Sequence, residues 1–198
     1  MRTLLLIALL SALALTGCQV FPFLSGASAP EAAAPSAEAP AMAESDTSDI
    51  MARPAWHSLA LTNARTGAAF TLADFTGQTV LVEPMATWCS NCRAQLGNAT
   101  RAAEQLASQP VVFVALSVAE NISDADLAAY AERQGFPFIF AVATPEMLAA
   151  LTANFGRAAI TPPSTPHFII APDGSVSSLF TGSKSAADLV SLLSAQGA

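Results

Sequence analysis

The sequence has few side chains that bind metals, and it has no basic patch. It contains three cysteines and two histidines among 198 residues. Only one cysteine pair, Cys89 and Cys92, has C-x-x-C spacing, and His57 and His167 lie far from it at irregular spacing. Because a structural zinc site takes four such ligands, this arrangement disfavours one. The formal net charge of −7, with no cluster of basic residues, argues against nucleic-acid binding.

Residues 19–50 lack any apolar periodicity. They are rich in alanine, proline, serine and glutamate, with Pro30, Pro35 and Pro40 evenly spaced. A segment that cannot bury apolar surface does not form a core, so we expect a disordered tether here. Some thirty flexible residues would span roughly 30 Å.

Residues 1–18 have the pattern of a targeting signal. Arg2 supplies a positive charge, and residues 4–15 form an apolar run too short to span a bilayer comfortably. The run ends in Leu-Thr-Gly followed by Cys18, which resembles the lipobox of bacterial lipoproteins. The resemblance implies that Cys18 is lipidated, which would leave one cysteine pair from an odd count. The alternative is an ordinary signal peptide with a chance cysteine.

Residues 51–198 are long enough for one domain. A hairpin is expected from residues 56–61 and 68–72. Further strands are expected at residues 79–83, 111–118, 136–142, 167–171 and 176–180, and helices at 92–106, 123–135, 144–156 and 185–195. Strands that alternate with helices before a closing hairpin predict an α/β fold, with a central mixed β-sheet flanked by helices.

Cys89 and Cys92 lie at the expected start of the helix at residues 92–106. Cysteines three residues apart share one face of a helical turn and are close enough to form a disulfide. Unsatisfied N–H groups at the helix start favour an anionic sulfur at Cys89, and the thiolate is the form that attacks disulfides. We therefore predict a redox pair in which Cys89, reachable by helix N–H groups and by solvent, attacks and Cys92 resolves. Half of a zinc site and an inert structural disulfide are the alternatives.

Two stretches around these cysteines resemble one known family. Residues 77–82 (GQTVLV) and 85–93 (MATWCSNCR) are similar to the active-site segment of the TlpA/ResA-like branch of the thioredoxin superfamily. The similarity runs from near Trp56 to the end of the chain, and Thr165-Pro166 before a strand matches the family's cis-proline loop. The resemblance implies a thioredoxin-like fold, a cis Thr165–Pro166 bond beside the cysteines, and a substrate-binding surface formed by Trp88, Thr165 and Pro166.

Glu83 is the only charged residue in the apolar strand at residues 79–83. It precedes Cys89 by six residues, where thioredoxin itself carries an internal carboxylate. Burial would raise the pKa of Glu83 and allow it to accept a proton from Cys92, so we predict a catalytic role. The alternative is that Pro84 ends or bulges the strand and turns Glu83 to solvent.

The sequence departs from the family pattern at several positions. Pro84-Met85 replaces the usual Phe-Trp, Asn91 replaces the proline often found before the second cysteine, and Gln95 replaces a frequent glutamate. Because the residues between the cysteines help set the reduction potential, Asn91 leaves the direction of electron flow open.

These patterns predict a lipid-anchored, extracytoplasmic thiol-disulfide oxidoreductase that needs no cofactor. The resemblance favours reduction of envelope-protein disulfides, including those of apocytochrome c, with electrons from a membrane donor. A disulfide oxidase remains an alternative. So does a copper chaperone that uses His57, His167 and Met85, since imidazole and soft sulfur suit Cu(I). A non-catalytic structural lipoprotein or adhesin is a third class, against which the cysteine pair counts.

Overall fold

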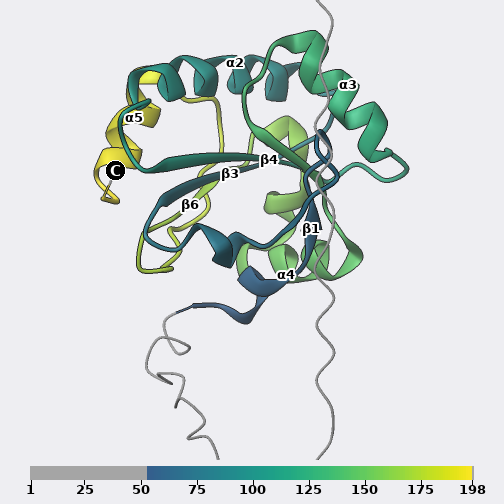
Figure 1. Ribbon diagram of the computed structural model, residues 1–198, viewed down its shortest axis with the longest axis horizontal. Helices are drawn as coiled ribbons and strands as arrows, with labels where there is room; N and C mark the ends of the chain where they lie inside the picture. Colours follow the sequence, from purple (N-terminus) through teal and green to yellow (C-terminus); the bar gives the residue numbers. More distant parts are fainter. Residues whose placement is uncertain (1–52, 198) are drawn as a thin grey trace, which may run out of the picture. The chain divides into compact units, whose positions relative to one another are not determined.

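The computed structural model describes residues 53–197, and its centre is a four-stranded sheet in the order β5-β4-β3-β6 (Figure 1). The strands are β3 (Thr79–Met85), β4 (Val111–Ser117), β5 (Ile139–Val142) and β6 (Phe168–Ile170). β3, β4 and β5 are parallel, and β6 runs antiparallel to β3. This confirms the predicted mixed sheet. The signal expected at residues 1–18, with Cys18, and the tether at 19–50 lie outside the described residues.

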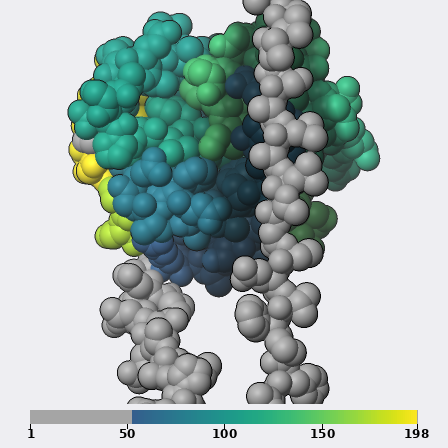
Figure 2. Space-filling model, viewed as in Figure 1, coloured from purple at the N-terminus to yellow at the C-terminus, as the bar shows by residue number. Residues whose placement is uncertain are grey.

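Helices cover both faces of the sheet. α2 (Ser90–Gln105), α3 (Asp124–Gln134) and α5 (Ala186–Ser194) lie on one face, and α4 (Pro145–Phe155) lies on the other (Figure 1). The space-filling view shows the elements on its near side packed closely together (Figure 2). Among residues 53–197, no helix combines the length and the apolar character that a membrane crossing requires.

The helix ends follow from local sequence signals. Ser123, Thr144 and Ser185 each cap a helix by accepting a hydrogen bond from a backbone N–H in its first turn. Gly135 ends α3 with φ of 69°, a left-handed conformation that glycine adopts without steric cost. These caps confirm the helices predicted after residues 123, 144 and 185.

Alternate residues of β3 contribute to two separate apolar clusters. Leu81 and Met85 belong to the cluster that includes side chains of α2, α3 and α5, whereas Val80 and Val82 belong to the cluster that includes side chains of α4. Because successive strand residues point to opposite faces, Glu83 shares the face of Leu81 and Met85. The fold therefore directs the Glu83 side chain toward the face that carries α2.

β3 continues through Pro84 to Met85, so the prediction that the strand ends or bulges at Glu83 was wrong. β6 pairs with β3 only at residues 80–82, and the last of these pairs joins Val82 to Phe168. The backbone nitrogen of Pro84, two residues beyond Val82, faces the same side of β3 as that of Val82. No residue of β6 pairs with β3 at this position. The missing N–H of Pro84 therefore removes no ladder hydrogen bond.

The N-terminal hairpin is shorter than expected. β1 (Leu61–Thr62) pairs antiparallel with β2 (Ala69–Phe70), which confirms a hairpin. The first expected strand residues, from 56, instead form a 3₁₀ turn, η1 (Ala55–Ser58), and a second turn, η2 (Leu72–Phe75), follows β2. Trp56 packs against Phe168 of β6, so η1 is attached to the sheet through side chains rather than through strand pairing.

The C-terminal hairpin is present as antiparallel bridges. His167 pairs with Phe180, and Ile170 pairs with Val176, on the side of β6 away from β3. The strand expected at residues 176–180 is thus reduced to two isolated contacts. Two short 3₁₀ turns, η3 (Arg157–Ile160) and η4 (Pro162–Ser164), lead from α4 into β6.

Candidate active site

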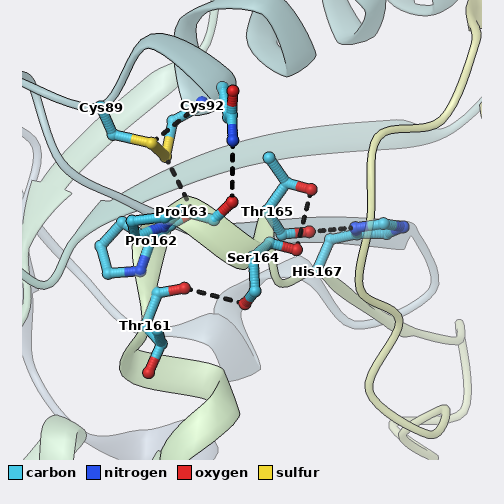
Figure 3. Close-up of a disulfide and its surroundings, with 9 residues drawn as sticks. Cys89, Cys92, Thr161, Pro162, Pro163, Ser164, Thr165 and His167 are labelled. Carbon is cyan, nitrogen blue, oxygen red and sulfur yellow. Dashed lines mark hydrogen bonds between the residues drawn. A yellow bond between two sulfur atoms is a disulfide. The ribbon is translucent and has the colours of Figure 1, made fainter.

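Cys89 is the N-cap residue of α2 and is joined by a disulfide to Cys92 (Figure 3). Their Cα atoms are 5.3 Å apart. The backbone N–H of Cys92 donates to the Cys89 sulfur over 3.1 Å. The helix thus directs one of its unsatisfied N–H groups at Cys89, and in the reduced protein this contact favours a thiolate there.

The two cysteines are equally buried, each about 3% exposed. The expectation that solvent reaches Cys89 is therefore wrong for the disulfide form. What distinguishes the two sulfurs is the helix, because the Cys89 sulfur accepts the N–H of the first turn. Trp88, directly before the pair, is 65% exposed and is the most exposed large apolar side chain of the described residues.

The turn η4 lies against the disulfide. The carbonyl oxygen of Pro162 is 3.2 Å from the Cys92 sulfur, and the side-chain amide of Asn91 donates to the carbonyl oxygen of Pro163 over 3.0 Å (Figure 3). A disulfide sulfur has no proton to donate, but the thiol formed on reduction has one, which the Pro162 carbonyl can accept. Sequence reasoning missed both prolines, although they lie only a few residues before Thr165.

The Thr165–Pro166 bond is trans, because no peptide bond among residues 53–197 is cis. The prediction of a cis bond was wrong. Thr165 instead adopts a left-handed conformation with φ of 47°, and its N–H donates to the Pro162 carbonyl over 2.8 Å. The chain therefore turns from η4 into β6 at Thr165 itself, with no need for a cis proline.

Of the three residues expected to bind substrate, Trp88 is exposed while Thr165 and Pro166 are buried. Thr165 also lines an open groove of about 410 Å³ beside the cysteine pair. Its lining residues come from α2, η4 and the segment before α5: Asn91, Ala94, Pro163, Ser164, Thr165, Thr181, Gly182 and Ser183. Pro166 is not among them.

Glu83 is buried, with about 5% of its surface exposed. Burial raises the pKa of Glu83 to about 7, and the hydrogen bond that the Gln95 side chain donates over 3.2 Å acts in the opposite direction. The carboxyl group is therefore able to gain or lose a proton near neutral pH. The alternative in which Pro84 turns Glu83 to solvent is excluded.

The two histidines and Met85 are all buried. The Nδ1 atom of His167 lies 3.0 Å from the Thr165 carbonyl oxygen, and its ring stacks on Phe180. Burial lowers the pKa of His167, and it lowers the pKa of His57 to about 4. Among residues 53–197, no group of three or more histidine, cysteine, aspartate or glutamate side chains is arranged to hold a metal ion.

The fold and the cysteine pair together define the class of protein. A mixed α/β sheet, with a C-x-x-C disulfide at the start of the helix after its central strand, is a thioredoxin-like arrangement. The Redoxin family matches residues 25–193, and the chain belongs to this family. Family membership and the disulfide support thiol-disulfide oxidoreductase activity.

Solved structures of several thioredoxin-like proteins resemble the chain. A thiol:disulfide interchange protein of the thioredoxin family from Chlorobium tepidum is 26% identical, with a TM-score of 0.61, over 70% of this chain and 92% of that one. DsbF of Mycobacterium tuberculosis is 19% identical, with a TM-score of 0.58, over 73% and 98%. Copper-bound ScoI of Arabidopsis thaliana is 15% identical, with a TM-score of 0.57, over 70% and 94%. No curated protein matches the chain in sequence.

Proposed function

We propose that this protein reduces disulfides of cell-envelope proteins through Cys89 and Cys92. The observation that supports the proposal is the disulfide at the N-terminus of α2, with the Cys89 sulfur facing a helix N–H. The similar solved structures include a thiol:disulfide interchange protein, which supports the same chemistry. The buried Glu83 on the same face of the sheet supplies an acid that changes protonation near pH 7.

In the proposed reaction, the Cys89 thiolate attacks one sulfur of a substrate disulfide. A mixed disulfide forms and the other substrate sulfur leaves as a thiolate. Cys92 then gives its proton to Glu83 and attacks the Cys89 sulfur, which breaks the mixed disulfide and releases the second substrate sulfur. Two electrons pass from the cysteine pair to the substrate, and the Cys89–Cys92 disulfide of the structure is the oxidised product.

The substrate is proposed to be a protein segment that lies along the groove beside the cysteine pair. Trp88 offers an exposed apolar side chain at one side of the disulfide, and η4 offers the exposed residue Pro163. Access to the buried sulfurs requires a displacement of the surrounding surface. The bond between Asn91 and the Pro163 carbonyl is an exposed contact, which costs only about 1 kcal/mol to break.

We further propose that the protein is a lipoprotein, attached through Cys18 and a tether at residues 19–50 on the extracytoplasmic side of a bacterial membrane. An oxidising compartment keeps dithiols oxidised, so a reductase there needs a membrane donor to re-reduce Cys89 and Cys92. Apocytochrome c is a proposed substrate. Mass spectrometry of protein from a bacterial membrane should find a lipid on Cys18, and an unmodified Cys18 would refute the anchor.

The reduction potential of the cysteine pair tests the direction of electron flow. Equilibration with glutathione or dithiothreitol buffers, followed by alkylation of free thiols, measures it. A potential below about −200 mV supports a reductase, whereas one near −120 mV, typical of strong oxidants, supports the oxidase alternative.

The copper-chaperone alternative predicts a different result. The His57 ring packs edge-on against Trp56, and His167 is bonded to the Thr165 carbonyl. Among residues 53–197, neither histidine joins the cysteines in a group of three or more histidine, cysteine, aspartate or glutamate side chains that could hold a metal ion. Insulin reduction by the purified protein, measured beside its bound copper, separates the two. Turnover without copper supports the oxidoreductase, and stoichiometric Cu(I) without turnover supports the chaperone.

A further inference from the structure

Gln95 is a buried amide that joins three parts of the fold. It lies on α2, three residues after Cys92, and is 2% exposed. Its Oε1 atom accepts from the backbone N–H of Lys184 over 2.8 Å and from the hydroxyl of Ser183 over 3.1 Å. Its Nε2 atom donates to Glu83 over 3.2 Å. The cysteine helix, the central strand and the segment before α5 therefore meet at this one side chain.

The orientation of the Gln95 amide follows from the Lys184 contact. A backbone N–H can only donate, so the side-chain atom that faces it must be the oxygen. The NH₂ group is then directed at Glu83, and a flipped amide would set two donors against each other at Lys184. Gln95 is thus held as a donor to the Glu83 carboxylate.

Few other polar groups act on Glu83. Glu83 lines a small enclosed space, and the other residues that line it are apolar: Leu81, Leu96, Ala99, Phe113, Val114, Ala115 and Phe138. The elements packed against this face of the sheet carry further ionisable groups: Cys89, Cys92, Arg93, Arg101 and Glu104 on α2 and its N-cap, Asp124, Asp126, Tyr130, Glu132 and Arg133 on α3, and Lys184 and Asp188 at the start of α5. None of them contributes to the pKa shift of Glu83, whose causes are burial and the Gln95 hydrogen bond. The Lys184 ammonium group is directed at the Thr181 carbonyl oxygen. Among the described residues, Gln95 is the only hydrogen-bond partner of the Glu83 side chain.

We propose that Gln95 is a positioning residue that holds the Glu83 carboxyl group on the cysteine face of the sheet and stabilises its ionised, proton-accepting form. Desolvation favours the neutral acid, and an amide donor favours the carboxylate, so the two effects oppose each other at Glu83. The proton-transfer part of this inference rests on the proposed role of Glu83 as the acceptor of the Cys92 proton. The positioning of the Glu83 carboxyl group by Gln95 does not depend on that role.

Titration of Glu83 in the disulfide form tests directly whether Gln95 stabilises its carboxylate, because Cys89 and Cys92 do not titrate in that form. Carbon-13 NMR of labelled glutamate, with Glu83→Gln to assign the signal, gives the midpoint. Gln95→Met keeps the length of the side chain and removes the donor, so we expect the midpoint to rise by about one pH unit. Gln105→Met on the exposed part of the same helix is the matched control, with no expected change.

A second variant keeps the inference testable if Gln95→Met fails to fold. Gln95→Glu can still accept from Lys184 and Ser183, but it places a second carboxyl group against Glu83. Two carboxyl groups at one site cannot both ionise readily, so the Glu83 midpoint should again rise, with a separate second titration step. A Glu83 midpoint that is unchanged in both variants would overturn the inference.

Kinetics separates this inference from the proposed function. The pH profile of the resolving step should move upward in Gln95→Met in step with the Glu83 midpoint, and the control should not move it. If the midpoint moves while Glu83→Gln leaves the resolving rate unaltered, Gln95 does hold Glu83 and the proposed proton transfer is wrong. If Glu83→Gln slows resolution but the Glu83 midpoint is unchanged in the Gln95 variants, the proposed proton transfer is supported and this inference is wrong.

Discussion

Glu83 and His57 are two buried ionisable side chains in different regions of the molecule. Glu83 lies on the cysteine face of the sheet and accepts a hydrogen bond from Gln95. His57 lies in η1 beside Trp56, and its Nε2 atom has no hydrogen-bond partner among the described residues. Burial moves the pKa of each toward the neutral form, to about 7 for Glu83 and about 4 for His57.

The difference between them lies in their neighbours. Burial lowers the pKa of His57 to about 4, so its imidazole is neutral at pH 7, and the ring packs edge-on against Trp56. Glu83 changes protonation near pH 7 on the same face as the helix that carries Cys92. A shifted pKa alone therefore does not identify a functional site, whereas a shift beside a reactive group supports one.

The largest effect should come from the cysteines. Cys89→Ser should lower insulin reduction at least about a hundredfold, because the attacking thiolate is lost. His57→Leu removes a buried ionisable group outside the cysteine site and should leave the rate at the wild-type level. A turbidity assay with dithiothreitol compares the two variants. A large loss of activity in His57→Leu would contradict the claim that only the region of Glu83 and the cysteines takes part in the reaction.

The order of the two cysteines should appear in trapping. Cys92→Ser leaves Cys89 free to attack but unable to resolve, so mixed disulfides with envelope proteins should accumulate on Cys89. Non-reducing electrophoresis with mass spectrometry detects them. The roles are reversed if trapping occurs in Cys89→Ser instead.

Local signals in the sequence predicted the position of the cysteine pair well. Cys89 and Cys92 adjoin an apolar strand and a segment with helical spacing, so the helix start depended on neighbouring residues alone. The mixed sheet followed from the same kind of evidence. The trans Thr165–Pro166 bond could not be predicted, since the same residues are compatible with either isomer when the path of η4 is unknown.

Contacts between distant segments explain the other misses. The continuation of β3 through Pro84, in place of the expected end or bulge at Glu83, depends on where β6 stops pairing with β3, and no residue near Pro84 indicates that position. The Gln95 network joins α2 to Ser183 and Lys184, residues 88 and 89 positions further along the chain. From the sequence, Gln95 was only a departure from a family pattern, and its partners were not visible.

A smaller effect is expected when the charge of Glu83 is removed. Glu83→Gln keeps the shape but cannot accept a proton, so the resolving step at pH 7 should slow about tenfold or more, while attack by Cys89 is unchanged. Stopped-flow fluorescence of Trp88 offers a signal for the two steps. His57→Leu should show wild-type rates in both, and equal slowing of attack and resolution in Glu83→Gln would contradict a role confined to Cys92.

The smallest effect should be a pair of opposite pH dependences of stability. Glu83 has a folded pKa above its unfolded value, so its contribution to stability is complete below about pH 4.5 and is lost as the pH rises through 7. His57 has a folded pKa below its unfolded value, so its contribution is complete above about pH 6.5 and is lost as the pH falls through 4.

Urea denaturation of the oxidised protein from pH 4 to 8 measures both terms. Relative to wild type, Glu83→Gln should gain stability as the pH rises, because the buried carboxylate is gone. His57→Leu should gain stability relative to wild type as the pH falls. In the wild type, the unfolded chain binds a proton at His57 that the folded protein does not bind, and the variant lacks this imidazole. If the wild-type and variant stability curves run parallel, burial does not separate the folded and unfolded pKa values of the substituted residue. The comparison between Glu83 and His57 would then be wrong for that residue.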